Sequence, residues 1–123
     1  MKKILIIIFI LIPFKSFSVE KKTTFTAEVF NQAQEEGRVV VINSWNKSCG
    51  TCAKQVQILD QAKEKFNNVV FLSFEQINNK EIAKLLNIDF WTTIVIYKNK
   101  KEVARSIGET NRDNIYSIIK KAI

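Results

Sequence analysis

The chain has 123 residues, of which 46% are hydrophobic, with only one proline and three glycines. This length holds one hydrophobic core and leaves no room for a second domain. The formal net charge is +7, but the basic residues are scattered among acidic ones, which favours a solvated surface over a nucleic-acid footprint. We therefore expect one monomeric domain with no nucleic-acid partner.

The first eighteen residues have the pattern of an export signal. Met1-Lys2-Lys3 is basic, residues 4–12 are an unbroken apolar run, and a short polar exit ends at Ser18. The apolar run is far shorter than the roughly 20 residues that cross a bilayer as a helix. We predict cleavage after Ser18, a mature domain over residues 19–123 and a periplasmic or otherwise exported location. Lys15 is unusual in an exit region, so an uncleaved membrane anchor is the alternative.

The mature chain predicts helices and strands in alternation. A helix over residues 26–36, with Thr26 as its N-cap and Gly37 as its stop, precedes a buried strand that runs from Val39 to Trp45. Ser48 is a candidate N-cap for a helix that starts near Cys49 and ends at Phe66. Later elements are a strand over residues 69–74, a helix over 80–86, strands over 93–97 and 102–107 that form a hairpin, and a last helix capped by Thr110 or Asn111.

Two cysteines, Cys49 and Cys52, lie at the junction between the first strand and the second helix, and the chain has no others. A helix N-terminus stabilises a thiolate through its free N–H groups and its dipole. We expect Cys49 at the solvent-facing helix tip and Cys52 one turn along, on the side of Val56 and Leu59. This favours thiol-disulfide exchange, with a static disulfide or a metal-binding pair as alternatives; a disulfide that closes so short a loop adds little stability.

These features together resemble the thioredoxin family. The resemblance covers nearly the whole mature chain and is carried by the run from Val39 to Trp45 before the cysteines, by Ile58-Leu59-Asp60, by Tyr97-Lys98-Asn99 and by Gly108. It implies an α/β thioredoxin fold, with a central mixed sheet of about four strands flanked by helices on both faces. It also implies that Cys49 attacks, that Cys52 resolves the mixed disulfide, and that the Cys49-Cys52 disulfide takes the place of any bound cofactor or metal.

Several positions depart from the family pattern. Around Gly50, Ser48 replaces the usual tryptophan and Thr51 replaces the usual proline, so a strongly reducing potential does not follow. Asn43 and Ser73 stand where a buried aspartate and its lysine usually assist proton transfer, and neither titrates near neutral pH. Glu75 is a distant substitute, and we expect slower or more pH-dependent exchange.

The segment before the third strand departs most. Thr92 stands where the family has a cis-proline, so we expect a trans peptide bond before it and a locally different loop, with more space at the thiols. Trp91, Thr92 and Thr93 are candidate substrate-binding residues: the backbone of Thr92 is expected to pair with a substrate strand, and its hydroxyl to contact a sulfur. Trp45 is expected to pack under the active site, and Phe90-Trp91 to form an apolar lip or to pack on the second helix.

We interpret the chain as an exported protein-disulfide oxidoreductase that exchanges dithiols and disulfides with protein substrates. The resemblance to short periplasmic relatives suggests the reducing direction, with electrons from a membrane thiol-disulfide transporter. Two alternatives stay open. One is a thiol oxidase of the same fold, because the bridge residues tune the potential widely. The other is a metal or iron-sulfur carrier that uses the two cysteines, although two sulfurs alone make an incomplete site.

Overall fold

The computed structural model describes Val19 and residues 21–123, so the predicted export signal over residues 1–18 lies outside the described residues. No helix in this part of the chain is long and apolar enough to cross a membrane. The element order agrees with the sequence prediction: α1 Ala27–Glu35, β1 Val40–Trp45, α2 Gly50–Lys65, β2 Val70–Glu75, α3 Lys80–Leu85, β3 Thr93–Lys98, β4 Lys101–Ile107 and α4 Arg112–Ala122.

The four strands form one mixed sheet in the order β2-β1-β3-β4. Strand β1 pairs in parallel with β2, from Val40 opposite Val70 to Trp45 opposite Glu75. The pairs β1-β3 and β3-β4 are antiparallel. Because parallel neighbours need a crossover connection, the chain passes from β1 to β2 through α2. This topology places the carboxyl end of the central strand β1 directly before the N-terminus of α2.

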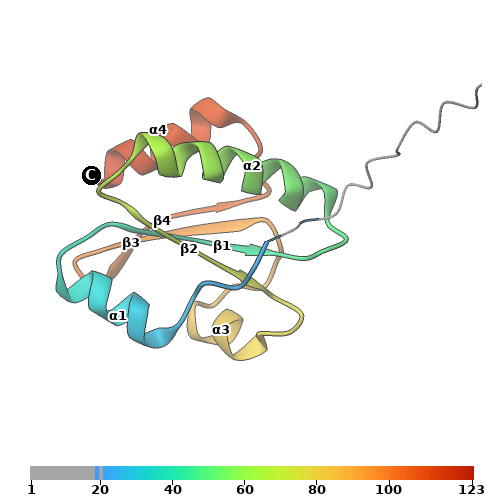
Figure 1. The fold of residues 1–123 in the computed structure, drawn as a ribbon, viewed down its shortest axis with the longest axis horizontal. Coiled ribbons are helices and arrows are strands. Elements are labelled where there is room, and N and C mark those ends of the chain that lie inside the picture. Colours follow the sequence, from blue (N-terminus) through green and yellow to red (C-terminus); the bar gives the residue numbers. More distant parts are fainter. Residues whose placement is uncertain (1–18, 20) are drawn as a thin grey trace, which may run out of the picture.

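Helices cover both faces of the sheet. Figure 1 shows α2 and α4 over one face and α1 and α3 over the other. Side chains of β1 alternate between the two layers: Val40 and Ile42 join the α1/α3 core, and Val41 joins the α2/α4 core. The α1/α3 core also contains Phe25, Phe30, Leu72, Phe74, Leu86 and Val95, and the α2/α4 core Leu59, Phe66, Ile94, Ile96, Ile115 and Ile119. The predicted thioredoxin fold is confirmed.

The predicted helix and hairpin boundaries are set by local chemistry. The Thr26 hydroxyl accepts a hydrogen bond from the Val29 N–H at 3.1 Å and caps α1. Gly37, with φ of 72°, follows the end of that helix in the left-handed conformation. Asn99 and Lys100 both have positive φ, which joins β3 to β4 through the two-residue turn that suits the strand twist.

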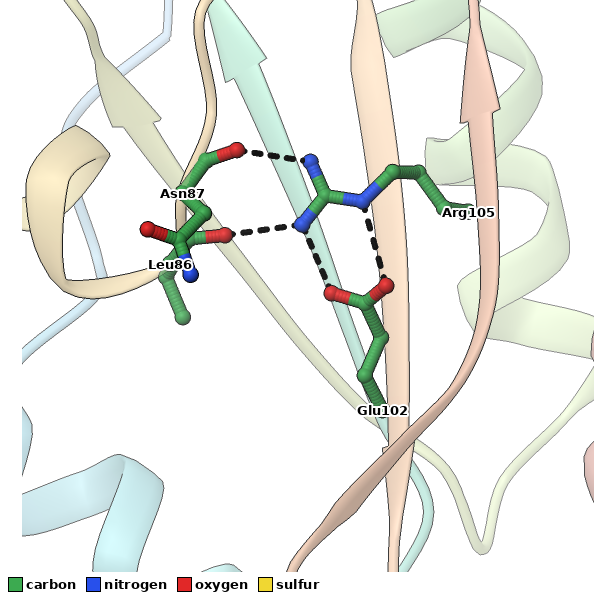
Figure 2. A network of polar contacts seen from close by, with 4 residues as sticks. All are labelled: Leu86, Asn87, Glu102 and Arg105. Atoms are coloured by element: carbon green, nitrogen blue, oxygen red, sulfur yellow. Dashed lines mark hydrogen bonds and ion pairs between the residues drawn. The ribbon is translucent and has the colours of Figure 1, made fainter.

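An arginine on the edge strand β4 fixes the end of α3 (Figure 2). The guanidinium of Arg105 donates to the carbonyl oxygens of Leu86 at 2.8 Å and Asn87 at 2.9 Å, and it pairs with Glu102 through contacts of 2.6 and 3.1 Å. The hydrogen bond with Glu102 raises the pKa of Arg105 above its ordinary value. These bonds satisfy the carbonyl of the C-cap residue Leu86 and that of the next residue, Asn87. They anchor the start of the loop that leads to Thr92.

Candidate redox site

The two cysteines form a disulfide at the N-terminus of α2, with their Cα atoms 5.2 Å apart. Cys49 is the N-cap residue: its backbone is extended, and its sulfur accepts a hydrogen bond from the Cys52 N–H at 3.1 Å. The first turn of α2 contains no acidic residue to compete for the positive end of the helix dipole. This position stabilises negative charge on the Cys49 sulfur.

The cap assigned to Ser48 from the sequence is wrong. The Ser48 N–H donates to the side-chain oxygen of Asn46 at 2.9 Å, and the Cys49 sulfur takes the cap position. Asn46 is itself buried, so this bond fixes the turn between β1 and α2 from inside. Ser48, Gly50 and Thr51 surround Cys49 on the exposed surface.

Cys52 lies beneath this surface and is fully buried. It belongs to a small apolar cluster with Val19, Trp45 and Val56, and Cys49 packs at the edge of the cluster. Trp45 is only 1% exposed, which agrees with a packing role and leaves no surface for substrate contact. Cys49 is a partly exposed residue and Cys52 a fully buried one, which is the burial expected of an attacking and a resolving cysteine.

Thr92 lies against both sulfurs. Its hydroxyl oxygen is 3.0 Å from the Cys52 sulfur and 3.5 Å from the Cys49 sulfur. The described residues contain no cis peptide bond, so the trans bond predicted before Thr92 is confirmed, and the loop differs through a φ of 61° at Thr92. The extra space expected at the thiols is not present, because the Thr92 side chain fills it.

The backbone of Thr92 is fully engaged within the protein. Its N–H donates to the Ser44 carbonyl at 3.0 Å, and its carbonyl accepts from the Gly108 N–H at 2.9 Å and from the Gln55 amide at 3.1 Å. These bonds use the donor and both lone pairs of the acceptor. The expectation that Thr92 pairs its backbone with a substrate strand is therefore corrected. The same bonds hold a non-glycine residue in the left-handed region, which is costly unless its surroundings fix it.

The neighbours of Thr92 are held through Ser44 on β1. The hydroxyls of Ser44 and Thr93 both donate to the Phe90 carbonyl, at 3.0 and 2.6 Å. Thr93 is buried, whereas Phe90 is 61% and Trp91 44% exposed. These exposed side chains agree with the predicted apolar lip.

Gln55, like Ser44, is a residue whose role the sequence analysis missed. It is fully buried, and its amide nitrogen donates both to the Thr92 carbonyl at 3.1 Å and to the Glu109 carbonyl at 3.0 Å. The amide thus ties α2 to the loop before β3 and to the loop after β4. The available signal was its spacing, three residues after Cys52 and four before Leu59, which places a polar residue within the apolar stripe of the helix.

Asn43 and Ser73 face each other across the β1-β2 pair, and both are buried. Ser73 donates to the Lys22 carbonyl at 3.2 Å, while the Asn43 amide nitrogen has no hydrogen-bond partner within the described protein. Asn43 lines a cavity of about 80 Å³ shared with Lys21, Asp60 and Lys63. Glu75 ends β2 opposite Trp45 and is partly exposed. No titratable side chain takes the buried position of Asn43.

The site combines a helix-capping sulfur, a buried second sulfur and a hydroxyl that touches both. Within Val19 and residues 21–123, no group of three or more histidine, cysteine or acidic side chains is placed to hold a metal ion. A disulfide with one accessible sulfur exchanges by thiolate attack through a mixed disulfide. Fold and site together define a thiol-disulfide oxidoreductase.

Comparisons with known proteins give the family. The sequence profile of the Thioredoxin family matches residues 16–121. A thioredoxin from Coprinus comatus is 25% identical over 96 residues, which cover 76% of this chain and 90% of that protein. An H-type thioredoxin from Oryza sativa is 28% identical over 99 residues, 80% of each chain. The crystal structure of Trxlp from Edwardsiella tarda superposes with a TM-score of 0.73 at 23% identity, over 76% of this chain and 93% of that one.

The chain belongs to the thioredoxin family, and it is a protein-disulfide oxidoreductase. The family and the disulfide support exchange with protein disulfides, as the sequence predicted. The likeness to Trxlp supports the fold alone.

Gln55 provides a test of how the loops around the disulfide are held. We expect Gln55→Leu to lower the free energy of unfolding by about 1 kcal/mol, because two carbonyls lose a donor. Gln55→Glu should cost more, about 3 kcal/mol at pH 7, because a carboxylate would face the same two carbonyl oxygens. Since a protonated carboxyl can donate to one of them, the glutamate variant should lose stability as the pH rises. Urea unfolding at pH 5 and pH 7 measures both effects; equal stability of the two variants would contradict the clamp.

Proposed function

We propose that this protein is an exported thioredoxin that reduces disulfides in other exported proteins. Cys49 attacks the substrate disulfide, and Cys52 then attacks the mixed disulfide and releases the reduced substrate. Each cycle leaves the protein with the Cys49-Cys52 disulfide. This disulfide must be reduced again before the next cycle. We propose that a membrane thiol-disulfide transporter donates the electrons, because it can carry them from the compartment that supplies reductant.

The observation that carries the reducing direction is the modest stabilisation of charge at Cys49. The hydrogen bonds that the described residues make to its sulfur come from one backbone N–H at 3.1 Å and one hydroxyl at 3.5 Å. Strong oxidants of this chemistry owe their high potential to a greatly stabilised reduced form. A sulfur with one short neutral hydrogen bond supports a lower potential than theirs.

The N-terminal pattern supports export, and the fold is compatible with cleavage after Ser18. Val19 is 5% exposed, packs with Trp45, Cys52 and Val56, and donates its N–H to the Lys47 carbonyl at 3.2 Å. Cleavage before Val19 therefore keeps this residue in the domain core. An α-ammonium group at Val19 retains the hydrogens needed for the bond to Lys47.

The surface beside the disulfide supports protein substrates. Phe90 and Trp91 are exposed directly before Thr92, whose hydroxyl touches both sulfurs, and Ile107, which pairs with Thr93 across β3 and β4, is 57% exposed. Exposed aromatic residues of this kind bind apolar side chains of a protein partner. This lip favours unfolded or extended segments that surround a disulfide.

The reduction potential tests the direction. Equilibration of the domain over residues 19–123 with reduced and oxidised glutathione should give a potential clearly below the value of about −120 mV found for a strong oxidant. The fraction oxidised is read from thiol alkylation followed by mass spectrometry. A potential near that of a strong oxidant would replace the proposal with a thiol oxidase of the same fold.

Export is tested by the N-terminus of the mature protein. Expression of the full chain in a Gram-negative host, followed by fractionation and intact mass measurement, should give a periplasmic species that begins at Val19. Replacement of Ile8 by Asp, which interrupts the apolar run, should keep the full-length chain in the cytoplasm. A membrane-bound protein that still carries Met1, with its domain in the periplasm, would show that the segment is an anchor. A full-length chain that stays in the cytoplasm would overturn export.

A further inference from the structure

The Thr92 hydroxyl acts as a hydrogen-bond donor at the disulfide. Neither sulfur of a disulfide carries a proton, so the hydroxyl must be the donor in its contacts with Cys52 at 3.0 Å and Cys49 at 3.5 Å. The shorter contact is with Cys52, which is fully buried and cannot obtain a donor from bulk solvent. The sulfur that lacks a helix N–H therefore receives its hydrogen bond from Thr92.

We propose that Thr92 is a catalytic residue of the exchange, and that its hydroxyl stabilises the thiolate that forms on Cys52. This proposal rests only on the exchange activity, and neither the reducing direction nor export is needed for it. In the usual family pattern a buried carboxylate helps to remove the proton of the resolving cysteine. Asn43 cannot do that, because an amide does not titrate. Here a neutral donor, the Thr92 hydroxyl, would instead stabilise the Cys52 thiolate.

The step balances without another reactant. When a substrate thiolate attacks the Cys49 sulfur, a bond forms between the two sulfurs, the Cys49-Cys52 bond breaks, and its electron pair moves to the Cys52 sulfur. The Thr92 hydroxyl keeps its proton and donates a hydrogen bond to this new thiolate. In the reverse step, the Cys52 thiolate attacks Cys49 in the mixed disulfide, and the substrate leaves as a thiolate.

The surroundings of Thr92 keep the hydroxyl aimed at the sulfurs. Three hydrogen bonds, from its N–H to Ser44 and to its carbonyl from Gly108 and Gln55, fix the backbone at a φ of 61°. A strained backbone conformation that is held by its neighbours is a frequent mark of a functional residue. Ser44 and Gln55 are positioning residues in this account, since they act through Thr92.

The titratable groups near Cys52 do not replace Thr92. The cluster that packs on Cys52 is formed by Val19, Trp45 and Val56, whose side chains do not titrate. In the domain over residues 19–123 the α-amino group of Val19 does titrate, but it is the same in every Thr92 variant compared. Asp60 is an exposed residue bonded to Lys21 at 3.0 Å, and Glu75 is a partly exposed residue opposite Trp45. Hydrogen bonds from Asn111 and Asn114 lower the pKa of Glu109, which keeps that carboxylate ionised.

A stopped-flow reaction of the reduced domain with excess Ellman's reagent isolates the step. Attack by Cys49 releases the first coloured thiolate at a rate that depends on reagent concentration, and resolution by Cys52 releases the second at a rate that does not. Thr92→Val keeps the shape of the side chain and removes the donor. Hydrogen bonds to charged groups are worth enough to change the thiolate fraction about tenfold to a hundredfold.

Thiolate nucleophilicity opposes part of this change. The reactivity of a thiolate rises by about the square root of the factor by which the acid dissociation constant of its thiol falls. This gain offsets part of the loss in thiolate fraction. Below neutral pH we therefore expect Thr92→Val to slow the second phase about threefold to tenfold. At high pH, where Cys52 is ionised in both proteins, the valine variant should be equal or faster. The two pH profiles therefore converge or cross at high pH, which a merely structural defect would not produce.

Two further variants complete the experiment. Thr92→Ser retains the hydroxyl and should restore the profile of the unmodified protein. Thr26→Val removes the cap of α1 on the opposite face of the sheet, where the bond to Val29 is 3.1 Å; it should lower the urea midpoint of unfolding and leave both phases unchanged. If Thr92→Val does not fold, Thr92→Ala carries the same prediction.

Each outcome decides the proposal. A valine variant with an unchanged second phase and unchanged pH profile would overturn it, and so would a serine variant as slow as the valine variant. Two clear phases in the unmodified protein would sustain exchange whatever the Thr92 variants show. Their absence would count against the oxidoreductase function itself.

Discussion

The hydrogen bond from the Cys52 N–H to the Cys49 sulfur, at 3.1 Å, is the interaction on which this site depends. It makes the reactive sulfur the cap of α2, so the sulfur satisfies an N–H that the helix leaves free and lies at the positive end of its dipole. The parallel pairing of β1 with β2 requires a crossover connection at this point of the chain, and α2 makes it. The fold therefore delivers a sulfur to a helix N-terminus as a direct result of its strand order.

The second constraint is the segment that faces the disulfide. This segment turns through a trans peptide and a positive φ at Thr92, and its shape is maintained by Ser44, Gln55 and Gly108. Arg105 fixes the start of the same loop at the end of α3. The Thr92 hydroxyl consequently reaches both sulfurs, and the N–H and carbonyl of Thr92 form hydrogen bonds within the protein. The exposed lip of Phe90 and Trp91 remains for substrate.

Patterns that depend on nearby residues were predictable. Continuous apolar runs located the buried strands, and the side chain of Thr26 and the glycine at Gly37 located the ends of α1, because capping is a local interaction. The burial of Cys52 followed from its helical spacing to Val56. Ser48 failed as a cap because α2 begins one residue later, with the Cys49 sulfur as its cap, and because Asn46, a buried neighbour, engaged the Ser48 backbone. The roles of Gln55 and Ser44 could not be predicted, since their partners belong to loops far along the chain.

The capping position makes Cys49 the reactive cysteine, and burial makes Cys52 the protected one. Alkylation of the reduced domain with limiting iodoacetamide near neutral pH, followed by peptide mass spectrometry, compares the two directly. We predict that the label lies almost entirely on Cys49, because that residue is partly exposed and its sulfur is stabilised as a thiolate. Equal labelling of both cysteines, or faster labelling of Cys52, would contradict it.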